Sequence, residues 1–155
     1  MMNLDEWNKA KECVYYWDGS WRDIYVLDTT LDHWSKWIDL INEKYSVEFY
    51  NGQTQQVEPI IDKRAVFDYL KGESDLLNSA TVEIGSVSVK CHFFTETEIE
   101  NDIDPREVVT IEDHNRLVEY FVDMSKLLNK EVVITAENQR DIICMSVDKE
   151  VISLK

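Results

Sequence analysis

Apolar residues recur at helical spacing after the sequence Thr29-x-x-Asp32. This sequence is a variant of the capping box in which Asp takes the place of Glu or Gln, and it predicts that a helix begins there. We therefore expect a helix over 31–44. Its apolar face consists of Leu31, Trp34, Ile38, Ile41 and Tyr45.

The same signal recurs at 110–113 and precedes a second apolar face of helical period. It predicts a helix over 111–128 that ends at Asn129. Two further segments have weaker helical patterns. They are a short N-terminal helix over 3–12, and a helix that opens at Glu58-Pro59 and stops at Gly72.

Strands are predicted between and after these helices, because β-branched and aromatic residues alternate with polar ones around turn dipeptides. The hairpins imply mostly antiparallel pairing, so the fold class is α+β: a central, mostly antiparallel sheet with about three helices packed on it. The predicted strands are Val14–Trp17 and Trp21–Leu27 around Asp18-Gly19, Ser46–Tyr50, a hairpin from Val82 to Phe93 around Gly85-Ser86, Val132–Ala136, Ile142–Val147 and Val151–Leu154.

Composition narrows the class of partner. The chain has 155 residues, with 31 Asp and Glu against 16 Lys and Arg, and a formal net charge of -15. Such a charge repels phosphate backbones and anionic lipid headgroups, so we expect neither nucleic-acid nor membrane binding. It attracts basic proteins or cations instead, although acidity that serves solubility alone is an equal alternative.

The length favours a single domain that spans residues 1–155. The residue usage favours a location in the cytoplasm. The N-terminus lacks the basic and apolar regions of a signal peptide, and no apolar stretch approaches the length of a membrane span. The cysteines are odd in number and lack CxxC spacing, which indicates reduced thiols; they are Cys13, Cys91 and Cys144.

An alternating acidic run follows the predicted hairpin that ends at Phe93. Successive side chains of a strand point to opposite faces, so the acids would share one face for as long as the strand continues. Like charges in a row repel each other, and a basic partner would relieve that repulsion. The expected partner-binding residues of the run are Glu96, Glu98, Glu100, Asp102 and Asp104.

Two other interpretations of this run stay open. A bend at 102–105 would bring Asp102 and Asp104 together, and with His92 they form a candidate calcium or manganese site, although the spacing lacks the glycine and terminal Glu of an EF-hand loop. The run is alternatively a solvated edge strand, kept acidic to prevent pairing between sheets.

A second unusual stretch is the aromatic segment 15–25. Trp21 and Arg22 are candidate partner contacts here, because exposed aromatic and Arg side chains dominate many interfaces. Packing of these rings in the core is the competing explanation.

Catalytic signatures are lacking in the sequence, which contains no GxSxG, HExxH or glycine-rich phosphate loop. Cys91 and His92 are adjacent, so in a strand they point to opposite faces and cannot form a nucleophile–base pair. We expect no cofactor, and whether the chain is an enzyme is uncertain, with the balance against it.

The stretches Trp17–Val26 and Cys91–Glu98 resemble segments of uncharacterised bacterial proteins. The whole chain resembles the small, acidic, α+β immunity proteins of bacterial polymorphic-toxin and contact-dependent systems. This resemblance implies a cytoplasmic inhibitor that covers the active site of a toxin with an acidic surface. Because such proteins vary greatly in fold, it assigns no binding residue.

Three hypotheses follow for the function. The first is a non-catalytic interaction protein, an immunity-type inhibitor of a basic toxin or of another basic protein. The alternative is a metal-dependent enzyme or metal-stabilised module that uses the carboxylates at 96–107. A homodimer that pairs through an exposed strand is a third hypothesis, and the repulsion between facing acids argues against it.

Overall fold

The computed structural model describes residues 3–155. It contains four α-helices, against the expectation of about three packed on the sheet, and a short 3₁₀ turn. The helices are α1 (Leu4–Cys13), α2 (Leu31–Lys44), α3 (Lys63–Leu70) and α4 (Ile111–Leu128), and the turn is η1 (Pro105–Glu107). The strands are β1 (Arg22–Leu27), β2 (Ser46–Asn51), β3 (Gln56–Glu58), β4 (Ser79–Ile84), β5 (Val87–Cys91), β6 (Glu98–Ile103), β7 (Val132–Ala136), β8 (Gln139–Asp148) and β9 (Val151–Leu154).

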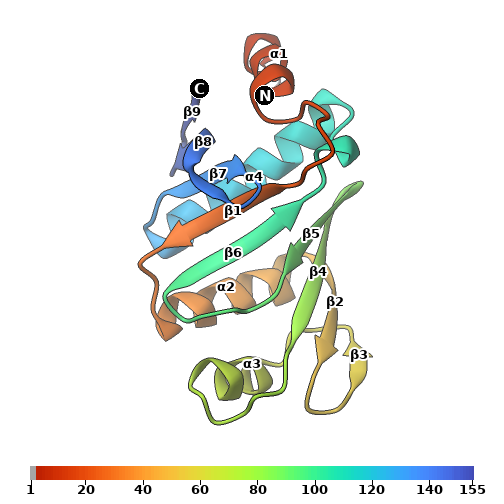
Figure 1. The fold of residues 1–155 in the computed structure, drawn as a ribbon, viewed down its shortest axis with the longest axis vertical. Helices are drawn as coiled ribbons and strands as arrows, with labels where there is room; N and C mark the ends of the chain where they lie inside the picture. Colours follow the sequence, from red (N-terminus) through yellow and green to blue (C-terminus); the bar gives the residue numbers. More distant parts are fainter. Residues whose placement is uncertain (1–2) are drawn as a thin grey trace.

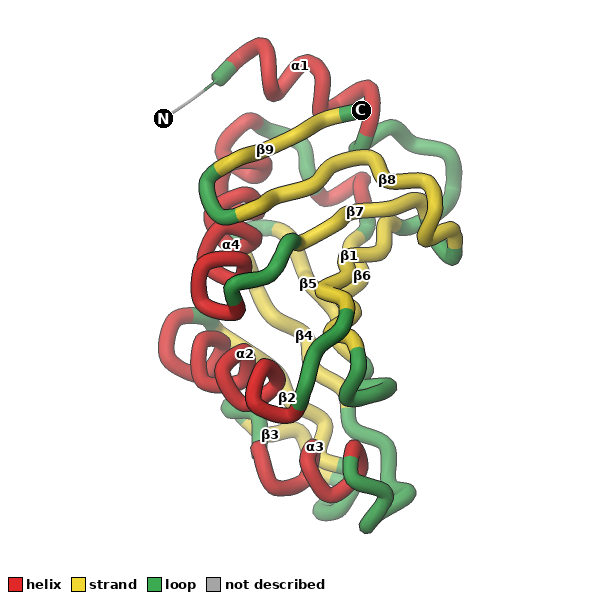
Figure 2. The backbone as a smooth tube through the Cα atoms, turned by 90° about the vertical axis from the view of Figure 1, so that its left-hand side faces the viewer, coloured by secondary structure: helices red, strands yellow, loops and turns green. Residues whose placement is uncertain are grey.

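The strands form one nine-stranded sheet in the order β3-β2-β4-β5-β6-β1-β7-β8-β9, and neighbouring strands are antiparallel. The long helices α2 and α4 lie along one face of this sheet (Figures 1 and 2). Within residues 3–155, no helix lies over β5, β6 and β1 on the opposite face (Figure 2). The α+β fold class is confirmed, and one sheet face is left uncovered.

The two strongest helix predictions are confirmed at their stated bounds. The start of α4 is capped as expected, because the Asp113 backbone N–H donates to Thr110 Oγ1 at 3.2 Å and the Thr110 N–H donates to Asp113 Oδ2 at 3.1 Å. At α2 the predicted capping residues are wrong by one position. Thr30 is the N-cap and its N–H donates to His33 Nδ1 at 3.0 Å, whereas Thr29 donates to a distant carbonyl.

The predicted helix start at Glu58-Pro59 is wrong, because Glu58 ends strand β3 and α3 begins at Lys63. Asp62 caps α3 by accepting from the N–H groups of Arg64 and Ala65. The stop is as predicted, since Gly72 follows the helix with a φ of +79°. A carboxylate at the N-cap therefore determines where this helix begins, and Pro59 lies in the preceding turn.

The predicted hairpin over 14–27 is also wrong, since only β1 forms and its partners are β6 and β7. The segment before it bonds to the Arg22 guanidinium instead of to a neighbouring strand. Arg22 Nε donates to the Val14 carbonyl at 2.7 Å, and Nη2 donates to the Tyr16 carbonyl at 2.7 Å. The buried cation thus satisfies carbonyl groups that a hairpin would have paired.

The remaining strands form near the predicted positions, although β5 ends at Cys91 instead of Phe93. β4 and β5 form a hairpin across Gly85-Ser86, and β7, β8 and β9 form a meander at the end of the chain. β8 is longer than expected because it begins at Gln139 instead of Ile142. Its first residues extend the meander over the end of β7, which places Arg140 near the middle of the sheet.

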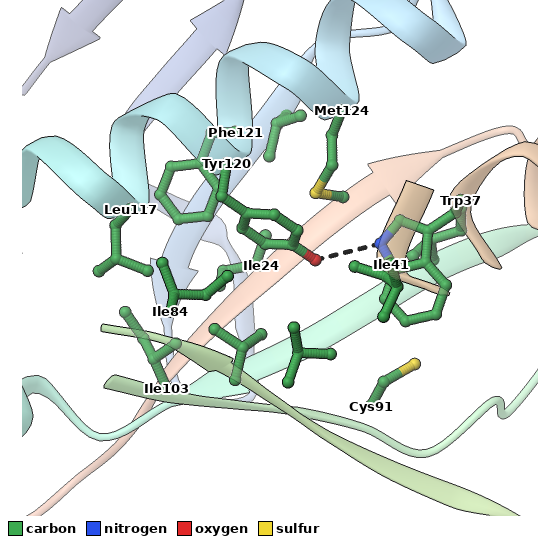
Figure 3. Close-up of a cluster of buried hydrophobic side chains, with 14 of the residues drawn as sticks. Ile24, Trp37, Ile41, Ile84, Cys91, Ile103, Leu117, Tyr120, Phe121 and Met124 are labelled. Carbon is green, nitrogen blue, oxygen red and sulfur yellow. Dashed lines mark hydrogen bonds between the residues drawn. The ribbon is translucent and has the colours of Figure 1, made fainter. Parts of the chain in front are cut away.

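The core lies between the sheet and helices α2 and α4. Figure 3 shows Tyr120 of α4 directed toward Trp37 of α2, whose Nε1 donates to the Tyr120 hydroxyl at 3.1 Å. That hydroxyl donates in turn to Asn101 Oδ1 at 2.6 Å. A buried polar chain therefore links both helices to β6. None of the described helices is long and apolar enough to cross a membrane.

A carboxylate cluster on the uncovered face of the sheet

Strand β6 divides its side chains between two environments. Ile99, Asn101 and Ile103 are buried, whereas the three alternate acids point to the uncovered face. These acids are Glu98, Glu100 and Asp102. The alternation predicted from the sequence is therefore correct over the length of the strand.

The other two acids of the run lie outside the strand. Glu96 is exposed in the preceding loop. Asp104 caps the 3₁₀ turn, and its carboxylate accepts from Arg106 Nη2 at 2.8 Å. The acidic face is thus shorter than expected, because the strand begins at Glu98 and ends at Ile103.

The edge-strand interpretation of the run is wrong. β6 lies between β5 and β1, and the edges of the sheet are β3 and β9 (Figure 1). Because the backbone of β6 is paired on both sides, its acids are not needed to block strand addition.

Asp23 on β1 completes the cluster. It lies opposite Asp102 in the β1–β6 register and is only 3% exposed. Carboxylate oxygens of Asp23, Glu100 and Asp102 all lie within 4.8 Å of one another. The sequence analysis did not select Asp23, although one signal was present: it is an acid that directly precedes the apolar run from Ile24 to Leu27.

The surroundings neutralise some of the acids and leave others without a cation. Arg140 holds Glu98 through Nη1 to Oε1 at 2.6 Å, and its guanidinium lies 4.6 Å from the centre of the Tyr25 ring. Asp23 Oδ2 accepts from the Asn138 backbone N–H at 2.8 Å and from the Tyr25 hydroxyl at 3.3 Å. Among the described residues, the buried Glu100 Oε1 has no hydrogen-bond partner.

Burial without a paired Lys or Arg raises the pKa values of Glu100 and Asp102. Burial, reinforced by the charge of Glu100 and by hydrogen bonding to Asp23, raises the pKa of Asp102 to about 8. Burial also raises the pKa of Glu100. By contrast, hydrogen bonds from Arg106 lower the pKa of Asp104. Asp102 therefore retains its proton at neutral pH, and a cation placed beside it would displace that proton.

The proposed metal set of Asp102, Asp104 and His92 is brought together only in part. His92 Nε2 lies 3.8 Å from Asp102 Oδ2, because β5 pairs with β6. Asp104 is engaged by Arg106 instead. The structure therefore corrects this set to Asp23, Glu100 and Asp102, which are the described carboxylates close enough to share one ion.

The two candidate contacts from the aromatic segment have different environments. Arg22 is fully buried and bonds the segment before β1, so it does not reach the surface and its assignment as a partner contact is corrected. Trp21 is half-buried and lines a small hollow of about 60 Å³ with Trp17 and Asp104. Trp17, which the sequence analysis did not select, is 71% exposed.

The cysteine and histidine side chains that could act in catalysis lie outside the carboxylate cluster. Cys91 is buried, and burial raises the pKa of its thiol, while His92 points to the uncovered face as predicted. His114 is also buried, between Glu6 at 2.7 Å and the Tyr15 hydroxyl at 2.7 Å. These contacts attach α1 to α4.

Comparison with known proteins gives one informative match. No protein-family model matches the chain, and no curated protein shows significant sequence similarity to it. The fold is similar to one chain of the 1.75 Å crystal structure of the toxic C-terminal tip of CdiA from Pseudomonas aeruginosa in complex with immune protein. The alignment has a TM-score of 0.50 at 10% sequence identity and covers 82% of this chain and 94% of that chain. At this identity, the likeness establishes a shared fold alone.

Proposed function

We propose that this chain is a non-catalytic, immunity-type inhibitor that binds a basic toxin, or another basic protein, through the uncovered face of its sheet. The observation that carries the proposal is the cluster of Asp23, Glu100 and Asp102, three carboxylates within 4.8 Å with no Lys or Arg among the described side chains paired to them.

The arrangement of charges on this face supports a basic partner. Arg140 neutralises Glu98 and Arg106 neutralises Asp104, so the acids that lack a cationic partner lie between these two pairs. A Lys or Arg from a partner would supply the cation that the cluster lacks, and charge-assisted hydrogen bonds to carboxylates are among the strongest in proteins. The formal net charge of -15 would attract that partner at long range.

The fold likeness supports the same class of function, because the similar chain comes from a complex between a toxin and its immune protein. An inhibitor of this kind acts where the toxin acts, which we propose is the bacterial cytoplasm. Glu96 and Trp21 lie near the two ends of the acidic face, and we propose them as peripheral contacts.

The test is binding to a basic partner isolated from the source organism by affinity capture, with salt used for elution. The double variant Glu100→Gln/Asp102→Asn removes two acids of the cluster. Its matched control, Glu12→Gln/Glu43→Gln, removes two exposed acids from α1 and α2. We expect the cluster variant to bind at least about tenfold more weakly, because each lost charge pair costs about 1.4 kcal/mol or more. Equal affinities for the two variants would contradict the proposal.

A metal-stabilised module or metal-dependent enzyme is the second candidate, and the spacing of the same cluster favours it. Oxygen ligands about 2.4 Å from a calcium ion lie within about 5 Å of one another, which agrees with the 4.8 Å limit found here. The test is thermal unfolding with added calcium or manganese. A rise of several degrees that is lost in Asp102→Asn would support this candidate, and no rise with either ion would exclude it.

A further inference from the structure

An apolar hollow borders the carboxylate cluster on the uncovered face. It has a volume of about 240 Å³ and opens to solvent. Strand β2, strand β4 with the loop before it, and the segment after β5 contribute its lining. The residues that line it are Tyr50, Leu77, Asn78, Ser79, His92 and Phe94.

The apolar side chains of this hollow are unusually accessible. Phe94 is 58% exposed, Leu77 is 61% exposed and Tyr50 is 41% exposed. Val57 lies opposite Tyr50 in the β2–β3 register and is 65% exposed, so the apolar surface continues onto β3. Contiguous exposed apolar surface bordered by polar residues is typical of an interaction site.

The backbone around the hollow is fixed in advance. Phe93 has a φ of +55°, a left-handed conformation that is costly for an aromatic residue. Its ring is buried against Trp34, with 5.4 Å between ring centroids, and this packing holds the turn. On either side of it, His92 and Phe94 stack with 5.3 Å between centroids. Strain of this kind is retained mainly where function requires it.

The opposite wall of the hollow is equally constrained. The Gly52 backbone N–H donates to Asn78 Oδ1 at 2.9 Å. A Cβ at Gly52 would lie 2.2 Å from the Leu77 carbonyl oxygen, so the two backbone segments are in close contact. The hollow therefore exists before any partner arrives, which lowers the entropic cost of filling it.

The hollow and the cluster form one continuous surface. His92 connects the two, since its ring stacks on Phe94 of the hollow and its Nε2 lies 3.8 Å from Asp102 Oδ2 of the cluster. Lys90 lies opposite Asp102 in the β5–β6 register, but its Nζ donates to Thr81 Oγ1 at 3.4 Å. A group seated in the hollow therefore has acids without a paired Lys or Arg at one side.

We propose that this surface binds one segment of a basic protein that inserts an apolar side chain into the hollow and places a neighbouring Lys or Arg on the carboxylate cluster. The proposal rests on the function proposed above and specifies the chemistry of the partner. An apolar anchor supplies affinity in a preformed hollow, and the adjacent charge pair supplies orientation.

The test uses two short synthetic peptides of identical positive charge, one with Leu and one with Ser between flanking lysines. Binding is followed by NMR titration of the labelled protein. We expect the Leu peptide to bind about tenfold more tightly than the Ser peptide, with shifts at the amides of His92 and Phe94. Phe94→Ala should abolish that preference, while Val151→Ala, a matched change at an exposed residue on edge strand β9, should preserve it.

The possible results separate this inference from the proposed function. If both peptides bind with equal affinity and Asp102→Asn weakens both, the cluster binds cations but the apolar anchor is wrong. If neither peptide binds at low salt, the cluster is not a basic-partner site and the inference fails with it. Phe94 is more than half exposed, so loss of folding does not complicate the Phe94→Ala result.

Discussion

Replacing Asp102 with Asn should make the protein more stable at alkaline pH. In the folded protein the pKa of Asp102 is raised to about 8 from an ordinary 3.8, with burial as the largest cause and the charge of Glu100 next. A carboxyl whose pKa is raised by folding stabilises the folded state while it is protonated. That contribution is lost as the pH rises from the ordinary value through about 8.

The magnitude follows from the change in pKa. A rise of about four units, at about 1.4 kcal/mol each, sets an upper limit of about 6 kcal/mol for the free energy lost on full ionisation. Water screens part of this cost, because the Asp102 side chain is 20% exposed. We therefore expect the stability difference between Asp102→Asn and the unmodified protein to widen by about 2 kcal/mol between about pH 5 and about pH 9, in favour of the variant.

The assay is urea unfolding followed by the fluorescence of the five tryptophans at several pH values. Asp104→Asn is the matched control, since Arg106 lowers the pKa of Asp104 and Asn is an equally good N-cap. The free energy of unfolding of the control variant should fall by less than about 1 kcal/mol, and this decrease should not become larger at alkaline pH. A constant difference between Asp102→Asn and the unmodified protein at all pH values would refute the reasoning.

Three further substitutions test the structure by the same unfolding assay. Arg22→Met should destabilise the fold by about 3–5 kcal/mol, because buried carbonyls lose a charged donor; a cost below about 1 kcal/mol would show that the segment before β1 does not depend on it. Tyr120→Phe should cost about 1–2 kcal/mol, since Trp37 Nε1 loses its acceptor, and unchanged stability would argue against that bond. Gly52→Ala should cost about 2–3 kcal/mol because its Cβ would collide with the Leu77 carbonyl, and a neutral result would mean that the two segments separate easily.

The parts of the fold that sequence reasoning predicted well depend on local signals. The bounds of α2 and α4 follow from apolar spacing, and the capping residues at the start of α4 lie within four positions of each other. The β4–β5 hairpin is equally local, because its turn joins strands that are adjacent in the chain. Local periodicity and turn chemistry are sufficient for such elements.

The errors arise where distant residues decide the outcome. Asp18-Gly19 does form a turn, with the Ser20 N–H donating to Asp18 Oδ1 at 3.0 Å, but it serves the buried Arg22 instead of a hairpin. The sequence pattern could not show that the guanidinium competes for those carbonyls. The polarity of Arg22 made a surface position the simpler expectation.

The candidate site was predicted in part for the same reason. Alternation along β6 is a local property, so Glu98, Glu100 and Asp102 were placed on one face correctly. Asp23 lies far away in sequence and joins the cluster only through the β1–β6 register. Strand order is a non-local property, and a single sequence does not reveal which strands become neighbours.

The position of β1 in the sheet has a consequence for how the protein folds. This strand comes early in the chain, yet its two neighbours are β6, at Glu98–Ile103, and β7, at Val132–Ala136. During synthesis its apolar residues, among them Ile24 and Val26, remain exposed to solvent until most of the chain has left the ribosome. Contacts between such distant segments slow folding and prolong exposure to aggregation. The middle of the sheet, where the acidic cluster lies, is therefore expected to be among the last parts of the molecule to assemble.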